Sequence, residues 1–144
     1  MRVPLPRSLA AGLVAAALLA PAASAASPVE ITLTVPAFGG TETFTATGGF
    51  CPSGTSTSSN FRFAGGGRAG TFHLDKTFWC ANGTDSLTIY LSAATANGSP
   101  QDQGGWKVIS GTGAYAGIRG GGNLVGDYPS TGGVIDHYVG VLTR

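Results

Sequence analysis

Apolar and polar residues alternate with a period of two along most of this chain, which is the pattern of half-buried β-strands. No helical period is found after Ala26. Glycine-rich turn signals such as Asn82-Gly83 separate the alternating runs. The pattern predicts eight short strands, at 30–35, 41–46, 60–64, 71–80, 86–93, 106–110, 118–125 and 134–143.

Eight short strands with regular turns predict an all-β fold, either a sandwich or a single antiparallel barrel. The chain both begins and ends in a strand, so its first strand could pair with its last. Such pairing leaves no exposed sheet edge, and we therefore favour the barrel. The polar stretch 48–59 is expected to be a long connection that only Cys51 tethers.

The apolar half of each run predicts which side chains point inward. In 71–80, Lys76 interrupts an otherwise apolar face, which indicates either a bulge or a charge directed inward. In 134–143, His137 alternates with Ile135, Val139 and Val141, which predicts an interior histidine, either a polar group inside a lumen or a hydrogen-bonded histidine of the core or rim.

The first 25 residues have the layout of a secretory signal peptide. Arg2 and Arg7 precede an apolar run at 9–20 that is too short to span a bilayer, and small residues end at Ala25. We expect cleavage after about Ala25, secretion, and one domain at 26–144 with no later membrane segment.

The net charge of the chain bears on whether nucleic acid is a partner. Loss of Arg2 and Arg7 changes the formal net charge from +1 to about −1. A near-neutral chain lacks the basic face that nucleic-acid binding requires, so no nucleic-acid partner is expected.

Two cysteines, Cys51 and Cys80, lie in the exported part and are expected to form one disulfide. The alternative is a reactive or metal-binding pair. The absence of a Cys-x-x-Cys motif and the polar loop around Cys51 disfavour it.

A glycine-rich stretch at 110–122 contains one tyrosine, Tyr115. A nucleotide-binding loop would need another spacing and a following helix. We expect instead a strand-bending hairpin in which Tyr115 covers a glycine-lined gap. The run from Val108 to Gly120, Val-Ile-Ser-Gly-Thr-Gly-Ala-Tyr-Ala-Gly-Ile-Arg-Gly, resembles the hairpin motif of the allene oxide cyclase/dirigent-like β-barrels.

The chain is most similar to the small secreted members of that family common in actinobacteria, which carry a tryptophan upstream, here Trp106, and an aromatic-x-Cys run, here Phe78-Trp79-Cys80. The resemblance implies an eight-stranded barrel whose lumen holds a small apolar molecule, and often oligomers. It carries no catalytic residues over to this chain, whose catalytic residues stay unknown.

Residues with catalytic potential are scattered. His73 and Asp75 share an outward face, and Trp79 and Tyr90 could form an aromatic platform across a hairpin. No nucleophile motif or metal-ligand set is recognisable, so neither metal nor cofactor is expected. The seven carboxylates are expected mostly in turns or on polar faces; they are Glu30, Glu42, Asp75, Asp85, Asp102, Asp127 and Asp136.

Three hypotheses for function follow. The first is binding of a small hydrophobic molecule in the lumen, with His137, Tyr115 and Trp106 as candidate ligand-binding residues. The second is a cyclase or isomerase, and the third is a structural or interaction protein with a packed barrel.

Overall fold

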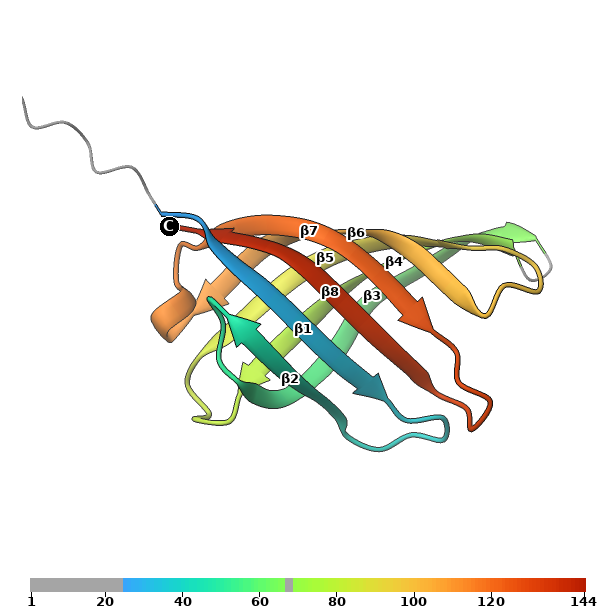
Figure 1. The fold of residues 1–144 in the computed structure, drawn as a ribbon, viewed down its shortest axis with the longest axis horizontal. Coiled ribbons are helices and arrows are strands. Elements are labelled where there is room, and N and C mark those ends of the chain that lie inside the picture. The colour runs from blue at the N-terminus through green and yellow to red at the C-terminus, as the bar shows by residue number, and fades with distance from the viewer. Residues whose placement is uncertain (1–24, 67–68) are drawn as a thin grey trace, which may run out of the picture.

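The computed structural model describes residues 25–66 and 69–144, and these form one closed barrel of eight antiparallel strands (Figure 1). The prediction of an all-β barrel is confirmed. All but the last residue of the expected signal peptide lies outside the described residues. The elements are β1 Ser27–Val35, β2 Glu42–Gly48, β3 Ser53–Gly66, β4 Ala69–Cys80, β5 Ser86–Thr95, β6 Gln101–Thr112, the 3-10 helix η1 Gly113–Tyr115, β7 Arg119–Asp127 and β8 Val134–Thr143.

The first and last strands close the barrel. β1 pairs with β8 along its whole length, from Ser27 opposite Leu142 to Val35 opposite Val134. This pairing covers the outer edges of β1 and β8, which protects them from pairing with other chains. In β3, by contrast, β2 pairs only with Ser53–Ser56, and the rest of the strand pairs with β4 alone.

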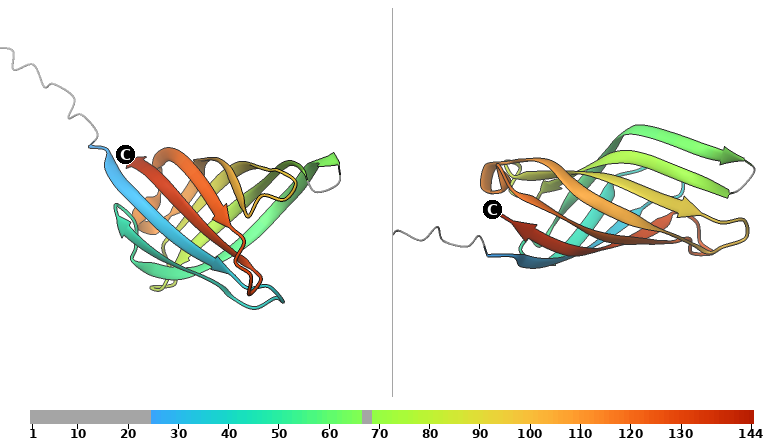
Figure 2. Two further views of the ribbon diagram at one scale, coloured as in Figure 1. Left: turned by 45° about the vertical axis from the view of Figure 1, so that its right-hand side comes forward. Right: turned by 90° about the horizontal axis from the view of Figure 1, so that it is seen from above.

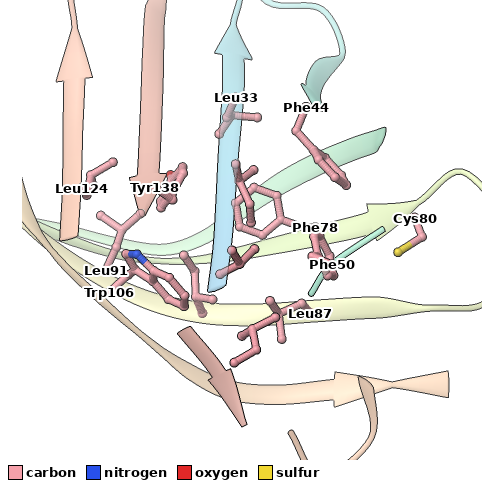
Figure 3. Packing of buried hydrophobic residues seen from close by; sticks show 14 of the residues in the cluster. Leu33, Phe44, Phe50, Phe78, Cys80, Leu87, Leu91, Trp106, Leu124 and Tyr138 are labelled. Atoms are coloured by element: carbon pink, nitrogen blue, oxygen red, sulfur yellow. The ribbon is translucent and has the colours of Figure 1, made fainter. Parts of the chain in front are cut away.

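Aromatic rings fill one half of the interior. Phe78 makes edge-on contacts with Phe44 and Tyr138, at ring-centroid distances of 5.3 and 5.4 Å, and Phe50 stacks on Phe44 at 5.6 Å. Figure 3 shows these side chains converging inside the barrel. Burial of each such ring contributes about 2 kcal/mol, and the edge-on geometry adds to it.

Glycines make room for the indole of Trp106, which is buried in the same interior. Gly122 lies opposite Trp106 on β7, and a Cβ at Gly140 on β8 would come within 2.6 Å of the indole ring. The indole Nε1 donates to the carbonyl of Asn123 at 3.1 Å. Tyr115 lies against another glycine of the run at 110–122: a Cβ at Gly111 would come within 3.1 Å of the Cβ of Tyr115, and the Tyr115 ring packs on Phe50 at a ring-centroid distance of 4.7 Å.

The polar stretch 53–59 belongs to a strand, which corrects the expected long connection. β3 covers Ser53–Gly66 and pairs with β4 on one side and β2 on the other. A register shift between Ser59 and Arg62, with Asn60 at φ 55°, marks a bulge in β3. No shift occurs at Lys76, whose side chain instead points inward and is buried.

The interior face of β8 is the opposite of the one predicted. Tyr138 is buried, with Ile31 of β1 and Leu124 of β7 as its cross-strand neighbours. Alternation then places His137 and Val139 outside, where both are exposed. The prediction of an interior His137 is therefore wrong.

The two ends of the barrel differ. At the end that holds the β4–β5 turn, the Cys51–Cys80 disulfide joins the β2–β3 connection to the end of β4, with Cα atoms 6.0 Å apart. At the other end, the β3–β4 hairpin and the β5–β6 loop project beyond the remaining strands (Figure 2).

The disulfide is expected to contribute substantially to stability because it closes a loop of 29 residues. Replacement of both Cys51 and Cys80 by alanine should lower the free energy of unfolding by roughly 3.5 kcal/mol, measured by denaturant titration. A titration of the unfolded wild-type protein should find no free thiol, and a titre of two would contradict the bond.

Gly113, which begins η1, is expected not to tolerate a side chain. Its φ is +57°, and a Cβ there would come within 1.9 Å of Oδ1 of Asp85, the oxygen that accepts the N–H of Ala114. Gly113→Val should cost more than about 1 kcal/mol in a thermal or chemical unfolding experiment. Gly105→Val is the control, since a Cβ there meets only the carbonyl of Gly122, at 3.4 Å; equal losses would refute this explanation.

Candidate functional site

A cavity of about 360 Å³ lies inside the barrel at the end opposite the disulfide. Its lining comes from the last residue of β1, the first of β2, three residues of β3 between Ser58 and Phe63, and three residues of β4 between Phe72 and Lys76. The remaining lining comes from the adjoining ends of β5 to β8. The lining residues are Val35, Glu42, Ser58, Phe61, Phe63, Phe72, Leu74, Lys76, Thr95, Asp102, Tyr128, Val134 and Asp136.

Aromatic and aliphatic side chains make up the wall near the opening. Phe61 stacks on Phe72 with ring centroids 6.4 Å apart, and Leu74 follows Phe72 on the interior face of β4. Phe61 is 64% exposed and Phe63 is 47% exposed. Exposed rings beside a hollow are typical of a binding site, because surface phenylalanines are otherwise unfavourable in water.

Lys76 carries a buried positive charge within this cavity. Its Nζ forms a salt bridge with Oε2 of Glu42 at 2.9 Å and donates to Oγ of Ser58 at 2.6 Å. Glu42 also accepts a hydrogen bond from the buried hydroxyl of Ser56. A lysine side chain only 4% exposed needs such partners, because an unpaired buried charge is costly. Ser56 and Ser58 of β3 therefore direct their hydroxyls toward the Lys76–Glu42 pair for an electrostatic reason.

Asp102 is the most deeply buried carboxyl group of the cavity, with 2% of the residue exposed. Its Oδ2 accepts a hydrogen bond from the hydroxyl of Tyr128 at 2.5 Å, whereas its Oδ1 is buried without a hydrogen-bond partner. Burial raises the pKa of Asp102, and the bond from Tyr128 and the backbone N–H of Gly126 oppose part of that rise. Burial and the nearby Asp102 also raise the pKa of Tyr128.

Asp136 lies two strands away from Asp102, with Gly126 between them. A Cβ on Gly126 would come within 2.3 Å of Asp102 Oδ1 and 2.8 Å of Asp136 Oδ1, so both oxygens converge over this glycine. Burial raises the pKa of Asp136 to about 6, and the charge of Asp102 adds to the rise while that of Lys76 opposes it. The hydroxyl of Tyr138 donates to Asp136 Oδ2 at 3.1 Å.

Together these groups give the cavity an apolar wall and an acidic floor. Three carboxyl groups (Glu42, Asp102 and Asp136) face one lysine, and that lysine is already engaged with Glu42. The floor can accept hydrogen bonds or attract positive charge, and Asp136 can exchange a proton near pH 6.

None of the three predicted ligand-binding residues lines this cavity. His137 is on the outer surface, with Nε2 3.4 Å from Oδ2 of Asp127 and Nδ1 3.5 Å from the hydroxyl of Thr32. Trp106 belongs to the packed core, and Tyr115 lies at the disulfide end.

The sequence interpretation missed the three acids because it placed most carboxylates in turns or on polar faces. A signal for Asp102 was present: it precedes Trp106 by four residues, an even spacing that puts both on one face of a strand. Asp136 and Tyr138 are two residues apart, and this even spacing also puts both on one face of a strand.

The other polar candidates lie on the outside. His73 accepts or donates a hydrogen bond with the hydroxyl of Tyr90 at 2.8 Å, and their rings stack. Trp79 is opposite Ser86 and Tyr90 is opposite Asp75, so Trp79 and Tyr90 form neither a binding platform nor the plain cross-strand aromatic pair that is the alternative to it. Among residues 25–66 and 69–144, no three His, Cys, Asp or Glu side chains gather as metal ligands.

Comparisons of the chain with protein-family models, with curated proteins and with solved structures found no match. In the described part of the chain, no helix has the length and hydropathy to cross a membrane.

Replacement of Asp136 by asparagine should stabilise the protein in a pH-dependent way. The folded-state pKa of about 6 exceeds the ordinary 3.8, so the folded protein retains a proton that the unfolded chain releases. Ionisation of Asp136 therefore lowers the free energy of unfolding as pH rises from about 4 to 6. At higher pH the loss of stability caused by Asp136 stays constant.

The free energy of unfolding of Asp136→Asn should exceed that of wild type by almost nothing at pH 4 and by about 3 kcal/mol above pH 7. Urea unfolding at each pH measures this difference. Asp127→Asn, an exposed carboxyl on the neighbouring strand, is the control and should show no gain of this size. A pH-independent effect of Asp136→Asn would contradict the assigned burial.

Proposed function

We propose that this chain is a secreted binding protein that holds a small hydrophobic molecule in the open end of its barrel. The observation that carries the proposal is the cavity of about 360 Å³ with an apolar wall, within the size range of small-molecule sites. The cavity lies next to the packed half of the barrel interior. This also supports binding, because a rigid wall loses little conformational freedom when a ligand enters.

The proposal includes membership of the allene oxide cyclase/dirigent-like barrels, on the motif at Val108–Gly120 and the closed eight-stranded topology. It also includes export. The signal-like pattern at the N-terminus and the pairing of Cys51 with Cys80 support an oxidising destination.

A second candidate is a cyclase or isomerase activity, and one observation favours it. Asp136 has a pKa of about 6 and lines a cavity that also contains Asp102 and Tyr128, so a proton could be given to a ligand or taken from it near neutral pH. The third hypothesis, a barrel packed throughout, accounts for the core around Phe78 but leaves the cavity unexplained.

Binding is tested by titrating the protein with Nile red, an uncharged apolar dye whose fluorescence increases away from water. We expect saturable binding, and a bulky residue in the cavity should weaken it. Val134 lines the cavity and Val139 is exposed on the outer face of the same strand. Val134→Trp should weaken binding at least ten-fold (about 1.4 kcal/mol), whereas Val139→Trp should leave it unchanged.

Absence of saturable binding to the wild-type protein would reject the proposal. Equal binding by the two tryptophan variants would place the dye elsewhere on the molecule and reject the assigned site.

A further inference from the structure

We infer that the cavity selects ligands in which an apolar body carries a protonated amine, with the ammonium group bound between Asp102 and Asp136. The inference rests on the proposed function and specifies the chemistry of the ligand. It is carried by the unpaired oxygen, the convergence of the two carboxyl groups and the charge balance of the cavity.

The first argument is the unpaired oxygen. Asp102 Oδ1 is buried, and no group among the described residues donates a hydrogen bond of normal geometry to it, although the backbone N–H of Gly126 lies close enough to the carboxyl group to lower its pKa. Its partner oxygen Oδ2 is occupied by the hydroxyl of Tyr128. A buried carboxylate oxygen without a donor is unfavourable, and a ligand that brings an N–H group to it removes that cost.

The second argument is geometric. Asp102 on β6 and Asp136 on β8 flank Gly126 on β7, and each directs its Oδ1 toward the same point above this glycine. An ammonium group has three donors and can bond two carboxylates at once with charge-assisted hydrogen bonds. Because Gly126 has no side chain, nothing at this position separates the carboxyl groups of Asp102 and Asp136.

The third argument is the charge of the lining. On β2, β4, β6 and β8 the charged groups are Glu42, Lys76, Asp102 and Asp136, while Tyr128 and Tyr138 supply neutral hydroxyls. The lining residues described on β1, β3 and β5 carry no titratable group. With all four charged groups ionised, negative charges exceed positive ones by two, so a cation is favoured over an anion.

The remaining lining fits the body of such a ligand. Leu74, Phe72 and Phe61 provide an apolar surface in the same cavity as the acidic floor. An amine with an alkyl or aromatic chain would bury that chain against these residues while its charge reaches the floor.

The test compares three ligands of the same length, octylamine, 1-octanol and octanoate, by isothermal titration calorimetry at pH 7.5. We expect octylamine to bind at least ten-fold more tightly than 1-octanol, and octanoate more weakly than either. At pH 5, where Asp136 is protonated, the advantage of octylamine should shrink because the floor loses a negative charge.

Two variants locate the binding. Asp102→Asn and Asp136→Asn should each remove most of the preference for octylamine and leave 1-octanol binding unchanged. Asp127→Asn, on the outer face, should retain the full preference. Both interior variants replace a buried acid with a neutral group of the same shape, and circular dichroism is used to check that they fold.

The outcomes separate this inference from the proposed function. If 1-octanol binds as tightly as octylamine, lumen binding stands and the selection for amines is wrong. If octylamine binds equally to wild type and to both interior variants, the assigned position is wrong. If none of the three ligands binds, both proposals are rejected.

Discussion

Closure of the barrel by β1 and β8 is the constraint on which the rest of the structure depends. Once Ile31 lies opposite Tyr138, and Tyr138 opposite Leu124, the inner and outer faces of three strands are fixed together. The same register directs Asp136 inward and His137 outward. A shift of one residue would exchange these two side chains and would remove both the core tyrosine and the acidic floor.

Filling of the interior is uneven, and this unevenness creates the site. Phe44, Phe50 and Phe78 fill the disulfide end, and Trp106 packs in the interior over Gly140, where a Cβ would come within 2.6 Å of the indole ring. The open end instead contains the charged groups of Lys76, Glu42 and Asp136. Burial of these charges costs free energy that the packed half must offset, a balance typical of a site kept for binding or chemistry.

The glycine-rich run at 110–122 has an architectural role. Gly113 permits the left-handed turn into η1, and Gly122 lies opposite Trp106 on β7. Neither glycine approaches the cavity at the open end. The motif that suggested a family therefore supports the barrel's shape, and the candidate chemistry lies on other strands.

The sequence by itself determined the fold class, the paired cysteines and the inward faces of β1, β4 and β5, because these strands have clear alternation between apolar and polar residues.

Tertiary structure decided two further elements. The first half of β3 was hidden since its serines and threonines lack an apolar face, and its inward hydroxyls are satisfied by Glu42 and Lys76, which come from other strands. β8 has apolar residues on both faces, so only its pairing with β1 and β7 decides that Tyr138 is inside and His137 outside. The cavity could not be predicted for the same reason: Asp102 and Asp136 meet over Gly126 through the register of three strands, which local alternation does not encode.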